Sequence, residues 1–136
     1  MTLHSEIFEQ PERLAALLNS QKQTVLEIAK AIQTRNVHYA FLAARGTSDN
    51  AGRYANYLWG AHNQLPLALA TPSLFTYYQS PPRLRNALVV GVSQSGQSPD
   101  IVSVLEEGRR QGCMTLAITN QAKSPLANVS DFALDI

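Results

Sequence analysis

Residues 87–98 read ALVVGVSQSGQS, and this stretch decides the fold of the 136-residue chain. Its first half, Ala87–Val92, is a valine-rich apolar run that is too short for a helix with an exposed face. Such runs are typical of strands in a parallel sheet, which are buried on both faces. The polar residues of 93–98 predict a loop, and Ser98–Gln111 then repeats apolar residues at helical spacing. We therefore predict a strand, a loop and a helix here.

The same pattern recurs on both sides of this stretch. Four further apolar runs predict strands, at Val37–Ala44, Leu65–Ala70, Met114–Thr119 and Phe132–Ile136. Helical segments alternate with the strands, at Ser48–His62, Pro72–Gln79, Ser98–Gln111 and Ser124–Val129. Alternating strands and helices predict a parallel sheet covered on both faces, with right-handed connections. The predicted fold is α/β: a three-layer αβα sandwich with a five-stranded parallel sheet, flavodoxin- or Rossmann-like.

A long helical segment, residues 1–36, precedes the sandwich domain of residues 37–136. We place Pro11 in the first turn of the helix, where its missing N–H costs nothing. Apolar residues then recur at helical spacing from Leu14 to Ile32, with a possible break at Asn19-Ser20. Two interpretations of this stripe stay open, namely packing on the chain's own sheet and the interface of a homodimer. Further along, Thr71 is a candidate N-cap for the short helix that follows it.

Composition excludes several classes of protein. The net charge is +1, and no cluster of basic residues stands out, so we expect no nucleic-acid partner. No apolar run approaches the length of about 20 residues that spans a bilayer, so we expect no membrane partner. The single cysteine, Cys113, excludes an internal disulfide and a cysteine metal site, and we expect it in the core. The N-terminal residues lack a secretory apolar segment, so we expect a cytoplasmic protein.

Two loops carry the candidate chemistry, because ligands of open parallel sheets bind at the carboxyl ends of the strands. In the first loop, Ala44–Asn50, Thr47 and Ser48 stand where a helix begins, and they serve either as helix caps or as ligand contacts. The second loop, Ser93–Ser98, offers three hydroxyls and free backbone N–H groups before a helix N-terminus. This composition favours a phosphate monoester over a plain turn, although the loop contains no lysine or arginine.

Other chemistries are poorly supported. Gly91 and Gly96 have the spacing of a nucleotide-binding P-loop, but Gln97 stands in place of the required lysine. Gly46 lacks the companion glycines of a dinucleotide-binding fingerprint. The three histidines are scattered, and no pair of carboxylates falls in a loop, so we name no catalytic residue, no metal site and no cofactor.

Both loops resemble those of the sugar isomerase (SIS) domain family. ARGTSDNAG, residues 44–52, resembles the family's C-G-T-S-x-x-A/S-G segment, and SQSGQSPD, residues 93–100, resembles S-Q-S-G-E-T/S-x-D. EIFEQP, residues 6–11, is similar to the start of the isomerase part of glutamine–fructose-6-phosphate aminotransferases, and LAITN, residues 116–120, matches a later strand. The resemblance implies a sugar phosphate as ligand. The site that it implies consists of Thr47, Ser48, Ser93, Gln94, Ser95, Gly96 and Ser98.

Three departures from the family pattern refine this expectation. Gln97 replaces the family's acid, and Thr2 is not the nucleophilic cysteine of a glutaminase domain, which also does not precede Met1. The chain stops at Ile136, before the second SIS domain that carries the family's ring-opening and proton-transfer residues. We therefore expect the first of two SIS domains, which binds sugar phosphates of the fructose 6-phosphate and glucosamine 6-phosphate class without turnover. Its parent would be a ketose/aldose-phosphate isomerase, a type II glucosamine-6-phosphate deaminase or an aminotransferase lacking a glutaminase domain.

Two alternatives from other classes remain. A regulatory SIS module would sense a sugar phosphate, but family regulators carry a helix-turn-helix domain, and residues 1–36 read as one helix. A nucleotide-binding or purely structural α/β domain is the second alternative, and the missing P-loop lysine counts against its nucleotide form.

Overall fold

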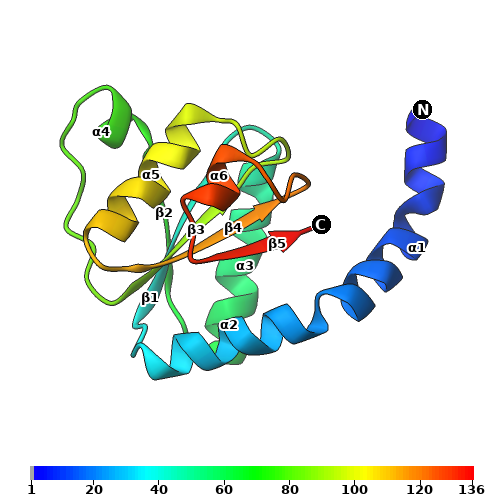
Figure 1. Ribbon diagram of the computed structural model, residues 1–136, viewed down its shortest axis with the longest axis horizontal. Helices are drawn as coiled ribbons and strands as arrows, with labels where there is room; N and C mark the ends of the chain where they lie inside the picture. Colours follow the sequence, from blue (N-terminus) through cyan, green and yellow to red (C-terminus); the bar gives the residue numbers. More distant parts are fainter. Residues whose placement is uncertain (1) are drawn as a thin grey trace.

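Five parallel strands form a single sheet in the order β2-β1-β3-β4-β5, as the computed structural model shows for residues 2–136 (Figure 1). The strands β3 and β4 have the predicted bounds, whereas β1, β2 and β5 are shorter than predicted. β2 is an edge strand, and Pro66 directly precedes it, as its missing N–H requires. The strands are β1 (Tyr39–Ala44), β2 (Leu67–Leu69), β3 (Ala87–Val92), β4 (Met114–Thr119) and β5 (Phe132–Asp135).

Helices cover both faces of the sheet, which confirms the three-layer sandwich (Figure 1). Alternate residues of β3 point to opposite faces, as the pleat of a strand requires. Leu88 and Val90 pack in one apolar cluster with Ile28, whereas Val89 packs in the other with Val104. The first face carries α2 (Lys22–Thr34) and α3 (Ser48–Asn63), and the second carries α4 (Ser73–Thr76), α5 (Pro99–Arg110) and α6 (Pro125–Asn128).

The N-terminal segment is two helices rather than one. α1 (Leu3–Ser20) ends at the predicted break, Gln21 caps its C-terminus, and α2 continues in a different direction (Figure 1). The prediction for Pro11 was wrong, because this proline lies inside α1 and not in its first turn. Thr2 and Ser5 form a capping box that starts the helix eight residues before Pro11.

The apolar stripe of the N-terminal segment divides at the same break. In α2, Ile28 is buried against the sheet, so this half of the stripe packs on the chain's own domain. In α1 no residue is buried, and Leu14 and Leu18 are 59% and 73% exposed. Figure 1 shows α1 extending away from the sheet. Packing on the chain's own sheet therefore describes α2, whereas the homodimer interpretation concerns α1.

Three smaller features complete the fold. Thr71 does not cap a helix, since α4 begins at Ser73 with Pro72 at the N-cap position and no side-chain cap. Cys113 is buried in the core as predicted, and its thiol donates to the carbonyl of Leu84 at 3.3 Å. Within residues 2–136, none of the helices has the length and apolar character needed to cross a bilayer.

Candidate functional site

The candidate loops meet where the strand order reverses. β1 and β3 lie side by side, but the chain visits the edge strand β2 between them. Ala44 pairs with Val92, the last residues of β1 and β3, so the two loops leave the sheet at the same level. In sheets of this order, that switch point is the usual position of a ligand site.

A polar cavity of about 210 Å³ opens between these loops, and we call it the cup. The structure brings five of the seven predicted residues to its wall, together with an arginine and two apolar residues. Thr47 lies outside the lining, exposed at the N-cap position of α3, and Gly96 is buried beneath the loop. The cup is lined by Arg45, Ser48, Val92, Ser93, Gln94, Ser95, Ser98 and Ile101.

Hydroxyl groups at the two helix starts are not used for capping. Ser98 holds the N-cap position of α5, and its carbonyl accepts from the N–H of Ile101 at 3.1 Å, but its side chain makes no capping hydrogen bond. Thr47 holds the same position in α3, and its side chain caps nothing either. The capping interpretation therefore fails for Thr47. Both hydroxyls remain free to bind a ligand.

Gly96 fixes the path of the loop after β3. Its φ of +63° is a conformation that side chains disfavour, and a Cβ there would lie 2.1 Å from the hydroxyl oxygen of Ser124. The Gly96 N–H donates to the hydroxyl of Ser93 at 3.2 Å, and its carbonyl accepts from the N–H of Leu126 at 3.0 Å. The loop is thus pressed against the start of α6, and only glycine fits at the point of contact.

Thr119, at the end of β4, holds the same loop from below. The carbonyl of Gln94 accepts from the Thr119 hydroxyl at 3.2 Å and from the N–H of Asn120 at 3.1 Å. Thr119 is fully buried, whereas Gln94 is exposed, so the backbone of Gln94 is fixed at the place where this residue lines the cup. The sequence analysis missed Thr119 and Ser124, whose only signal is their place at the end of β4 and in the loop that follows it.

Arg45 was also missed, and it changes the electrostatics of the site. The predicted loop after β3 contains no cation, but Arg45, the first residue after β1, lines the cup. Its Nη2 donates to Oδ2 of Asp100, in the first turn of α5, at 2.5 Å. The pair joins the two loops across the switch point. Its two residues come together because β1 and β3 end at the same level.

The cup is suited to bind an anion and lacks groups for proton transfer. Serine hydroxyls, an amide and the positive end of the 12-residue helix α5 converge on it. Among residues 2–136, neither a histidine nor a carboxylate lines it. The same part of the chain contains no cluster of three acidic, histidine or cysteine residues that could hold a metal ion.

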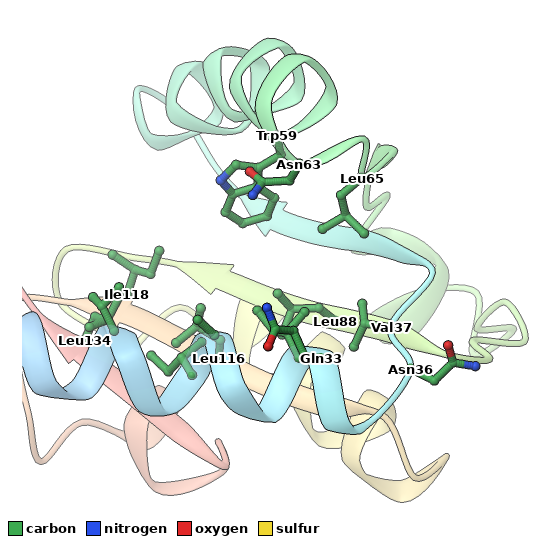
Figure 2. Close-up of a pocket in the computed structure, with 14 residues that line it drawn as sticks. Gln33, Asn36, Val37, Trp59, Asn63, Leu65, Leu88, Leu116, Ile118 and Leu134 are labelled. Atoms are coloured by element: carbon green, nitrogen blue, oxygen red, sulfur yellow. The ribbon is translucent and has the colours of Figure 1, made fainter.

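A second and larger hollow lies on the face of α2 and α3, and we call it the apolar groove. Its volume is about 560 Å³, and Figure 2 shows Leu88, Leu116 and Ile118 of the sheet on its floor. Trp59 projects into it from α3, and Gln33 is among its few polar residues. Most of the described residues that line the groove are apolar and none is charged, so we do not place the candidate site there.

Comparison with known proteins shows the family of the chain. The SIS domain family matches residues 34–136. The chain is 32% identical to the isomerizing glutamine–fructose-6-phosphate aminotransferase of Bartonella henselae, over 97% of this chain but 22% of that protein.

Two solved structures extend the comparison. A candidate phosphosugar isomerase from Silicibacter pomeroyi has a TM-score of 0.92 and 39% identity, over 96% of this chain and 40% of that one. The C-terminal domain of glucosamine-fructose-6-phosphate aminotransferase from Francisella tularensis has a TM-score of 0.81 and 28% identity, over 95% of this chain and 37% of that one. The chain thus spans less than half the length of these relatives, and it belongs to the SIS domain family.

Proposed function

We propose that this domain binds a phosphosugar by seating its phosphate in the cup. The observation that carries the proposal is the convergence of serine hydroxyls from two loops on the N-terminus of α5. Ser93, Ser95 and Ser98 would hold the phosphate, with backbone N–H groups of their loop. Thr47, Ser48 and Gln94 would contact the phosphate or the sugar hydroxyls, and Gly96 keeps the loop in place. The names of the relatives support a sugar phosphate as ligand.

The sugar that we propose is a hexose 6-phosphate of the fructose 6-phosphate and glucosamine 6-phosphate class. The relatives named as aminotransferases act on compounds of this class by name. Isomerisation requires a base within hydrogen-bond reach of the reacting carbon, and no such group lines the cup in residues 2–136. We therefore propose that the domain binds without turnover. It would serve a cytoplasmic two-domain isomerase, deaminase or aminotransferase as its first SIS domain.

Thermal unfolding with millimolar ligands tests this function. Fructose 6-phosphate or glucosamine 6-phosphate should raise the melting temperature, since a ligand at 100 times its Kd stabilises the folded state by about 2.7 kcal/mol. Ser95→Ala should weaken binding about tenfold or more, because it removes a hydrogen bond to a charged group. Ser103→Ala is the matched control, since the Ser103 hydroxyl donates to the carbonyl of Pro99 and lies outside the cup. A rise with ATP alone, or equal loss in both variants, would overturn the proposal.

We also propose that two copies of the chain pair through α1. The helix presents Leu3, Ile7, Leu14 and Leu18 to solvent, at spacings that place them along one side. An exposed apolar stripe of this kind marks an association surface. Sedimentation at tens of micromolar protein should show a dimer that Leu14→Glu dissociates and Glu12→Gln does not. A monomeric wild-type protein would contradict this arrangement.

A further inference from the structure

We infer that the Arg45 side chain binds the charged phosphate group of the ligand, and that Asp100 positions this side chain at the cup. The inference rests on the proposed function, and it adds a specificity-determining residue to that site. Among residues 2–136, Arg45 is the only ionisable residue that lines the cup.

The backbone of Arg45 is fixed, while its side chain remains accessible. It follows Ala44, which is buried and paired with Val92 in the sheet, so the base of the side chain stands at a defined place beside β3. The side chain itself is 55% exposed. The guanidinium group is therefore accessible to a ligand that enters the cup from solvent.

Asp100 holds the guanidinium group across the cup's rim. The recorded contact joins one nitrogen, Nη2, to one carboxylate oxygen, Oδ2. A guanidinium group carries five N–H donors in a planar fork, so a single contact leaves most of them for a second anion. Asp100 also belongs to the first turn of α5, which lies directly behind Ser98. The ion pair thus keeps the guanidinium group beside the cup, with N–H donors left for the phosphate.

The pair has little to do with the stability of the fold. Both side chains are partly exposed, and ion pairs of that kind contribute about 0–1 kcal/mol. A hydrogen bond between a guanidinium group and a phosphate is charge-assisted and stronger than one from a neutral hydroxyl. Loss of Arg45 should therefore reduce ligand affinity and leave the melting temperature of the free protein unchanged.

Calorimetric titration of fructose 6-phosphate tests the inference at two salt concentrations. Arg45→Gln should weaken binding about tenfold or more in low salt, and Arg45→Lys should weaken it less, because it keeps the charge but loses the fork. The affinity of the wild-type protein should fall as salt rises, and that dependence should be flatter in Arg45→Gln.

Arg53→Gln is the matched control, because Arg53 makes a similar ion pair with Asp49 at 3.2 Å and does not line the cup. Unchanged affinity and salt dependence in Arg45→Gln, together with lost binding in Ser95→Ala, would overturn this inference and leave the proposed function standing. Equal losses in Arg45→Gln and Arg53→Gln would overturn it as well, since they would reflect overall charge. If the wild-type protein does not bind fructose 6-phosphate at all, the proposed function fails first.

Discussion

The cup and the apolar groove are two hollows of this domain that differ in what their walls are made of. The groove is more than twice as large, at about 560 Å³ against about 210 Å³. Side chains of buried strand residues form its floor, and they contribute to the core. Loop residues form the cup, and a buried glycine and threonine hold their backbone in place. Size alone therefore does not identify a binding site. We expect the groove residues to stabilise the fold and the cup residues to bind ligand.

Leu88→Ala should show the largest effect on stability. Leu88 is buried on the floor of the groove, and truncation of such a leucine costs about 2–5 kcal/mol of the free energy of unfolding. Urea unfolding measures that loss, while titration below the unfolding transition should show unchanged affinity for fructose 6-phosphate. Leu69→Ala is the control, because Leu69 lies on the edge strand and is 38% exposed, so its cost should be smaller. Weakened binding in folded Leu88→Ala would show that the two regions are not separate.

Gly96→Ala should affect both stability and binding. The methyl group meets the side chain of Ser124, and the backbone must keep a positive φ, which together cost about 2 kcal/mol. The loop must also shift, so affinity for the phosphosugar should fall strongly. Gly112→Ala separates the two causes, because Gly112 has a φ of +80° but open space around it, and about 1 kcal/mol is expected there. Equal destabilisation in both variants would mean that the contact with Ser124 is unimportant.

The fluorescence of Trp59 should give the smallest and most selective signal. It is the only tryptophan in the chain, and it lines the groove and not the cup. Fructose 6-phosphate should leave its emission maximum unchanged, whereas an apolar dye that enters the groove should shift or quench it. Saturating phosphosugar should not displace the dye. A spectral shift with fructose 6-phosphate would place the ligand in the groove instead of the cup.

The sequence predicts the fold well, because the spacing of apolar residues is a local signal and the same residues form the core. β3 and β4 begin and end at the predicted residues, since each is a continuous apolar run closed by polar loops. Pro11 was misplaced because the capping box at Thr2 and Ser5 sets the start of α1, and the apolar stripe was read only from Leu14 onward.

The site was only partly predictable, because its parts come together over long distances along the chain. The motif in 93–98 identifies its own loop, but Arg45 joins it through the pairing of Ala44 with Val92, which no local pattern reveals. Thr119 and Ser124 act through backbone and packing contacts that appear only once β4 lies beside β3.

Because the Leu126 N–H donates to the Gly96 carbonyl, the exchange rate of this amide proton at the start of α6 reports on the opening of the loop after β3. Leu126 is fully buried, so its amide proton can exchange with deuterium only when this 3.0 Å bond opens. A ligand that rests on the other side of Gly96 should slow that opening and lengthen the lifetime of the proton. The occupancy of the cup would then be recorded about 30 residues further along the chain, by an atom that no ligand touches.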